Sequence, residues 1–67
     1  MVESIIINTV RDGYGIDQIR RTMTVAELIE VLEGYDPESP VYLSFDNGYT
    51  YGAIREERFE TGEAVYD

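Results

Sequence analysis

The sequence predicts a small α+β fold, in which one helix packs on one face of an antiparallel sheet. Three observations predict it: a β-branched run near the N-terminus, an apolar stripe at helical spacing after Thr24, and an Asn47-Gly48 pair between two strand-like runs. The 67 residues form one domain, residues 1–67. A chain of this size buries only about 60% of the surface that its unfolded form exposes, so we expect a small core and a second copy or another partner.

The first element is a predicted β-hairpin. Residues 4–10 are β-branched almost throughout, and Gly13 and Gly15 follow them in a turn. Residues 16–23 carry apolar side chains between polar ones, with neither strict alternation nor a clear helical stripe. We interpret them as the second strand, which pairs with the first.

The second element is a helix that begins at Thr24. Thr24 precedes Glu27 by three residues, which is the capping-box spacing, and Gly34 is suited to a left-handed residue after the last turn. Four apolar residues share a sector of about 100° on this helix. They are Val25, Leu28, Ile29 and Leu32. This stripe is expected to pack on the sheet.

The third element is a second hairpin, preceded by a turn that contains Pro37 and Pro40. With Asn47-Gly48 as the loop, the register runs from Asp46 opposite Tyr49 to Val41 opposite Ile54. Alternation then divides the side chains between two faces. The face toward the helix holds Val41, Leu43, Phe45 and Ile54, and the other holds Tyr42, Ser44, Asp46, Tyr49 and Tyr51. A short edge strand is expected near Phe59.

Composition makes most catalytic chemistry improbable. The chain has no His and no Cys, so it lacks the usual general base, a thiolate nucleophile, disulfides and a Cys-based zinc site. Its glycine-rich turns match neither a calcium loop nor a phosphate loop. We therefore expect a non-enzymatic protein without a cofactor or a metal. Without a signal peptide or an apolar run near 18 residues, the chain is expected to be soluble and cytoplasmic.

Charge is concentrated in one part of the chain. The formal net charge is −9; residues 1–23 sum to zero, and residues 24–67 contain eleven acids against Arg55 and Arg58. Direct binding of DNA or RNA is disfavoured, because it needs Lys and Arg to neutralise phosphates. The acids could instead compete with nucleic acid for a basic groove on another protein, or they could serve solubility alone.

Two sets of residues are candidates for partner binding. The electrostatic set is Glu27, Glu30, Glu33, Asp46, Glu56 and Glu57. The aromatic set is Tyr42, Tyr49 and Tyr51, since clustered tyrosines are typical of protein interfaces. The alternative interpretations are an ordinary solvated helix face for the acids and simple strand preference for the tyrosines.

Residues 23–54 resemble small phage and prophage proteins. The resemblance lies in the sequence Thr-Val-Ala-Glu-Leu-Ile-Glu-Val-Leu in the helix, Asp-Pro-Glu-Ser-Pro-Val in the turn and Asp-Asn-Gly-Tyr in the hairpin. It implies a mobile-element origin and a bacterial host cytoplasm. Some small acidic phage proteins, including anti-CRISPR proteins, inhibit host defence. The resemblance therefore also implies a second expectation, that this chain inhibits a bacterial protein with a basic surface. The alternative is a structural homo-oligomer, whose tyrosine face or free sheet edge pairs with a second copy.

Overall fold

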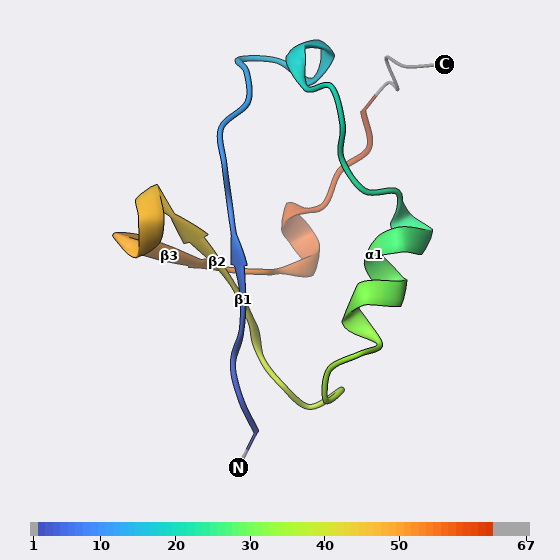
Figure 1. Cartoon of the computed structure of the whole chain (residues 1–67), viewed down its shortest axis with the longest axis vertical. Helices are drawn as coiled ribbons and strands as arrows, with labels where there is room; N and C mark the ends of the chain where they lie inside the picture. The colour runs from blue at the N-terminus through green and yellow to red at the C-terminus, as the bar shows by residue number, and fades with distance from the viewer. Residues whose placement is uncertain (1, 63–67) are drawn as a thin grey trace.

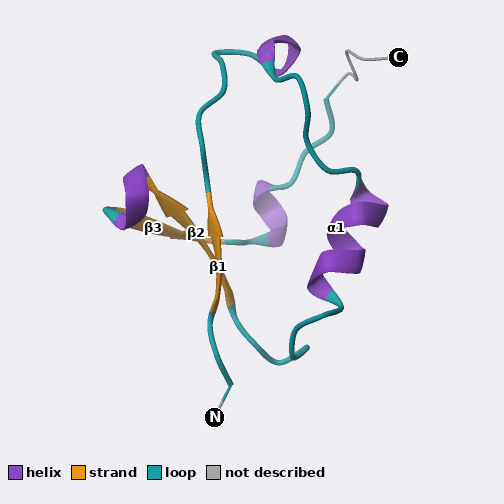
Figure 2. Cartoon of the chain, in the orientation of Figure 1, coloured by secondary structure: helices purple, strands orange, loops and turns teal. Residues whose placement is uncertain are grey.

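The computed structural model describes residues 2–62 and has one α-helix and three strands (Figure 1). The strands are β1 (Ile5–Asn8), β2 (Val41–Phe45) and β3 (Thr50–Ala53), and the helix is α1 (Val25–Leu32). Three short 3-10 turns accompany them (Figure 2): η1 (Ile16–Gln18) between β1 and α1, η2 (Asp46–Gly48) between β2 and β3, and η3 (Glu56–Arg58) after β3. The predicted α+β class is confirmed.

The sheet is mixed, in the order β1-β2-β3. β1 runs parallel to β2, with Ile5 opposite Val41 and Asn8 opposite Ser44, whereas β2 and β3 are antiparallel. The chain therefore leaves β1, passes through η1 and α1, and returns beside β1 as β2. The prediction of a wholly antiparallel sheet is wrong. In the structure a crossover joins β1 and β2, so these two strands run parallel.

The predicted first hairpin is also wrong. Residues 16–23 contain the η1 turn and no strand. Local hydrogen bonding explains part of this difference, since the Tyr14 N–H donates to the Gln18 side-chain oxygen at 2.6 Å and ties this segment to itself. The uninterrupted Ile5-Ile6-Ile7 run is typical of a parallel strand, and β2 supplies its partner.

The predicted register of the second hairpin is confirmed over the ladder, from Tyr42 opposite Ala53 to Phe45 opposite Thr50. Two predicted pairs lie outside this ladder: Val41 with Ile54, and Asp46 with Tyr49. The edge strand expected near Phe59 is absent from residues 58–62, where Phe59 follows η3 in an extended but unpaired segment. Residues 63–67 lie outside the described chain.

The η2 turn shows why the hairpin forms here. Asn47 and Gly48 have φ values of 58° and 88°, the positive values that a type I′ turn requires at its two central positions. The Tyr49 N–H closes the turn by donating to the Asp46 carbonyl at 3.1 Å. Asp46 also has a positive φ of 51°, so the ladder ends at Phe45. Asp and Asn tolerate this region better than other residues with a side chain.

The start of α1 agrees with the sequence prediction, and its end differs. The Glu27 N–H donates to Thr24 Oγ1 at 3.2 Å, and the Thr24 N–H donates to Glu27 Oε1 at 2.9 Å. This is the predicted capping box. Gly34 does not take a left-handed conformation; its N–H donates to the Val31 carbonyl, so the last turn tightens to an i→i+3 pattern.

Packing is sparse throughout residues 2–62. None of their hydrophobic side chains is buried, and the one buried residue among them is Ser44, which is 2% exposed. On the sheet, Ile5, Ile7, Val41 and Leu43 are half-buried and share one face by register. On α1, Val25 and Ile29 are 77% and 51% exposed. The expected packing of the helix stripe on the sheet is not confirmed.

Candidate functional site

The structure brings two of the three candidate tyrosines to one face of the sheet. Tyr42 and Tyr51 lie on neighbouring strands at diagonal positions, with Ser44 opposite Tyr51 on the same face. Tyr51 reaches toward the η2 turn, because a Cβ placed on Gly48 would lie 3.5 Å from its hydroxyl oxygen. Tyr42 is 38% exposed and Tyr51 is 60% exposed, so both can contact a partner.

Tyr49 is separate from this pair. It follows the η2 turn in a right-handed helical conformation and precedes β3 rather than lying in it. Its side chain is 86% exposed. We define the tyrosine face as Tyr42 and Tyr51, and Tyr49 as an exposed residue at the end of the hairpin.

The three helix acids are exposed but not equivalent. Glu27 is occupied by the capping box, where its carboxylate accepts from both the backbone and the hydroxyl of Thr24. Glu30 lies in the last turn of α1, and Glu33 is its C-cap. Negative charge at a helix C-terminus opposes the helix dipole, at a cost of about 0.3–1 kcal/mol for each residue. Local helix stability therefore does not account for Glu30 and Glu33.

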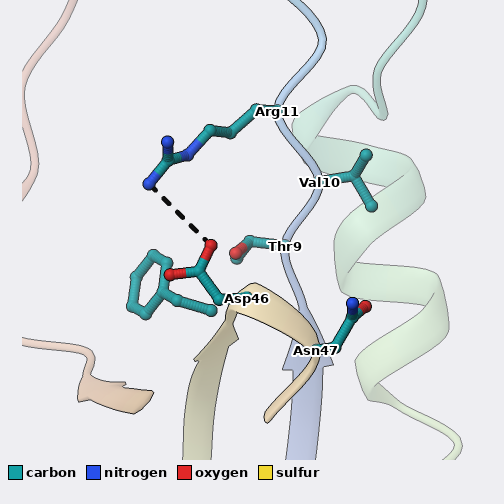
Figure 3. A pocket seen from close by; sticks show the side chains of 6 residues that line it. Thr9, Val10, Arg11, Asp46 and Asn47 are labelled. Carbon is teal, nitrogen blue, oxygen red and sulfur yellow. Dashed lines mark ion pairs between the residues drawn. The ribbon is translucent and has the colours of Figure 1, made fainter. Parts of the chain in front are cut away.

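Asp46 belongs to a pocket at the end of β1 and the η2 turn (Figure 3). Arg11 and Asp46 point toward one another across it, with 4.0 Å between Arg11 Nη2 and Asp46 Oδ1. Both side chains are largely exposed, so this ion pair contributes little to stability. The pocket has a volume of about 470 Å³, and its other lining residues are Thr9, Val10, Phe45 and Asn47.

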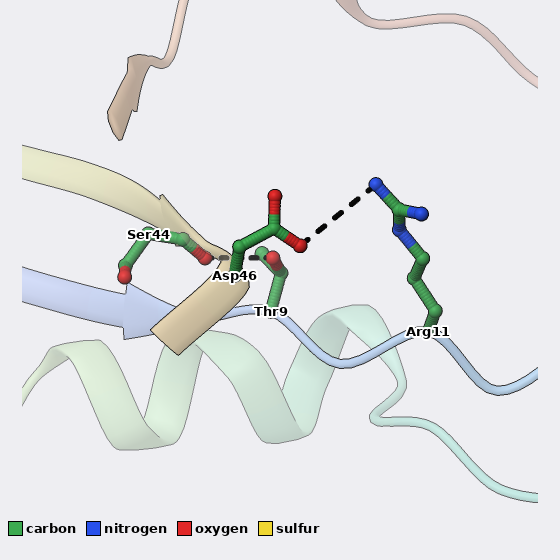
Figure 4. A network of polar contacts seen from close by, with 4 residues as sticks. All are labelled: Thr9, Arg11, Ser44 and Asp46. Atoms are coloured by element: carbon green, nitrogen blue, oxygen red, sulfur yellow. Dashed lines mark hydrogen bonds and ion pairs between the residues drawn. The ribbon is translucent and has the colours of Figure 1, made fainter. Parts of the chain in front are cut away.

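A short polar network lies beside this pocket (Figure 4). The Thr9 hydroxyl and the Thr9 N–H both donate to the Ser44 carbonyl, at 2.7 and 2.9 Å. These bonds extend the contact between β1 and β2 by one residue and place Arg11 opposite Asp46. Sequence reasoning missed Thr9 and Arg11, because the parallel pairing that brings them beside the η2 turn leaves no local pattern.

A second hollow lies at the C-terminal end of α1. It is an open groove of about 460 Å³, lined by Ile29, Leu32, Glu33, Tyr35 and Pro37. Sequence reasoning assigned the helix stripe to the sheet and so missed this groove. A signal was present, since the stripe of Ile29 and Leu32 continues directly into Tyr35 and Pro37.

Glu56 and Glu57, the remaining candidates, lie in η3 and are exposed. Within residues 2–62, no group of three or more carboxylates is arranged to hold a metal ion. The same part of the chain contains no helix long and apolar enough to cross a membrane. The groups that the structure presents are exposed apolar side chains, carboxylates and tyrosines.

Comparisons of the chain with family models, with curated proteins and with solved structures give no significant match.

Proposed function

We propose that this chain is a small, acidic, non-enzymatic module that binds a protein and completes its hydrophobic core on that partner. The observation that carries the proposal is the absence of any buried hydrophobic side chain in residues 2–62. An extended apolar surface on a small protein is typical of an interaction site. Burial of such a surface is the main source of free energy in association.

Charge favours a basic partner. The segment 22–54, which contains α1 and the second hairpin, carries six acidic residues and no Lys or Arg. Association of two such surfaces from identical chains would place like charges together, whereas a basic surface would be complementary. Basic grooves are the surfaces with which proteins hold nucleic acid, so competition with DNA or RNA is the proposed effect of binding.

Within this proposal the candidate residues have different roles. Glu30 and Glu33 are the free carboxylates of α1 and provide the electrostatic contacts, while Tyr42 and Tyr51 provide aromatic anchors. Glu27 and Asp46 contribute charge but already have partners, in the capping box and in the pair with Arg11. An inhibitor of the anti-CRISPR type, acting in a bacterial cytoplasm, is a concrete form of this function.

Charge reversal on α1 tests the proposal. The Glu30→Lys/Glu33→Lys double variant changes the net charge by +4, and both positions are exposed. We expect it to lose capture of a nucleic-acid-binding protein that the tagged natural chain retains from nuclease-treated bacterial lysate. The natural complex should dissociate when salt or competing DNA is added. Salt screens the contacts between acidic and basic side chains, and DNA replaces the acidic side chains on the basic surface.

The matched control is Glu3→Lys/Asp12→Lys, which changes the net charge by the same amount at exposed positions outside α1. We expect it to retain the captured protein. Equal loss in both variants would mean that total charge rather than the α1 surface is recognised. Recovery of the tagged chain alone would contradict a basic partner and would support pairing with a second copy.

A further inference from the structure

The groove at the end of α1 provides a specific place for the proposed partner. Ile29 and Leu32 form one side, and Tyr35 and Pro37, from the connection to β2, form the other. Its lining is almost entirely apolar, with Glu33 at the edge. Leu32 is 37% exposed and Tyr35 is 49% exposed, so substantial apolar area is available for burial.

The exposed apolar surface continues from the groove along the helix. Val25, Leu28, Ile29 and Leu32 share one face of α1 and remain exposed, and the helix is about 12 Å long. An isolated helix of two turns is unstable in water and depends on packing of its apolar face. A second helix laid along this stripe would supply that packing, with its end in the groove.

The rim of the groove defines the charge of this second helix. Glu33 lines the groove, and Asp36 and Glu38 adjoin its lining residue Pro37 in the sequence. The Asp36 carboxylate accepts a hydrogen bond from the Glu38 N–H at 2.8 Å, which holds that part of the connection as a turn. The nearest basic residues along the chain are Arg21 and Arg55. Residues 22–54 therefore contain no cation that could neutralise the acids of this rim.

We infer that the α1 stripe and its groove bind an amphipathic helix of a partner protein, in which Lys or Arg residues flank an apolar face. The apolar face would lie on Leu28, Ile29 and Leu32, and the cations would face the acidic rim. This mode combines burial of apolar anchors with charge complementarity. The inference rests on the proposed function and specifies the chemistry of the partner.

A designed peptide tests this inference without knowledge of the natural partner. The probe is a Leu/Lys peptide of about four helical turns, with Leu on one face and Lys elsewhere. Two control peptides replace either every Leu by Ser or every Lys by Glu. We expect the full-length chain to bind the Leu/Lys peptide more tightly than both controls, with NMR shift changes concentrated at Ile29, Leu32 and Tyr35.

Matched variants place the binding site. Leu32→Ser should weaken binding of the Leu/Lys peptide by about tenfold. Val31→Ser removes a similarly exposed apolar side chain from outside the stripe and should have little effect. Glu33→Gln, which retains the size of the side chain, should weaken binding and lower its salt dependence. A far-UV circular dichroism spectrum like that of the natural chain checks that each variant keeps its secondary structure.

Three results would overturn the inference. Equal binding of the Ser/Lys peptide would show that charge alone is recognised, and equal binding of the Leu/Glu peptide would remove the basic partner. Binding that Leu32→Ser leaves unchanged would place the site elsewhere. Each of these can occur while lysate capture remains sensitive to Glu30→Lys/Glu33→Lys, so failure of the groove is distinguishable from failure of the proposed function.

Discussion

Replacement of Ser44 by Asp is expected to unfold the sheet. Ser44 lies in the central strand and is 2% exposed, so a carboxylate at this position would be removed from water. The nearby cation, Arg11, already pairs with the exposed Asp46. A buried charge without a partner costs about 3 kcal/mol or more. That cost is comparable to the whole stability of a domain of this size. Hydrogen exchange of the Thr9 amide, which donates to the Ser44 carbonyl, should lose its protection.

Asn8→Asp is the control for this prediction. Asn8 lies directly opposite Ser44 in the sheet, on the same face, and is exposed. The substitution introduces the same side chain one strand away, where water solvates it, and we expect Thr9 protection to remain near that of the natural chain. Equal protection in the Ser44→Asp and Asn8→Asp chains would contradict the burial of Ser44.

Replacement of Gly48 by Val is expected to disrupt the second hairpin. The φ of Gly48 is 88°, in the region that L-residues with a branched Cβ avoid most strongly. A residue held there costs about 1–3 kcal/mol. The new Cβ would lie 3.5 Å from the Tyr51 hydroxyl oxygen, which is an ordinary contact distance, so the backbone conformation accounts for the cost. Cross-strand NOEs between Tyr42 and Ala53 should weaken or disappear in the variant.

Gly48→Asn is the control that separates the effect of backbone strain from the effect of adding a side chain. Asn adopts positive φ more readily than other side chains, so this variant should retain most of the hairpin. Similar losses in the Val and Asn variants would mean that side-chain crowding at Tyr51, and not the backbone conformation, decides the outcome. Intact cross-strand NOEs in Gly48→Val would contradict the turn geometry.

The local elements could be predicted from the sequence because their determinants are close together in it. Thr24 and Glu27 are three residues apart and satisfy one another, which fixes the start of α1. Asn47 and Gly48 provide two adjacent positive φ values, which fix the hairpin and its register. Neither feature requires knowledge of the rest of the chain.

The pairing of β1 could not be predicted in the same way. Ile5 and Val41 are neighbours in the sheet but lie 36 positions apart in the sequence, and no local pattern records their contact. Residues 16–23 resembled a strand because apolar and polar side chains are mixed there without a clear period. The Ile5-Ile6-Ile7 run did contain information, since both faces of a parallel strand tend to be apolar.

The residues of the candidate site that depend on local pairing could be predicted, and those that depend on contacts between distant segments could not. Alternation correctly placed Tyr42 and Tyr51 on one face, because the hairpin register was right. It placed Asp46 and Tyr49 wrongly within the ladder, because the turn begins one residue earlier than a two-residue loop requires. The pocket beside Arg11 and the groove beside Tyr35 are formed by contacts between different segments. Sequence periodicity contains no information about such contacts.

The central claim is that the isolated chain leaves its apolar side chains uncovered and buries them on a partner. Calorimetric unfolding of the chain, at a concentration where sedimentation shows a monomer, tests this most directly. A packed domain of this length has a heat-capacity change of unfolding of about 0.8 kcal/mol/K, because unfolding exposes its apolar core. We expect less than about half of that value. A concentration-independent transition with the full heat-capacity change would show that the chain packs a core by itself and would contradict the claim.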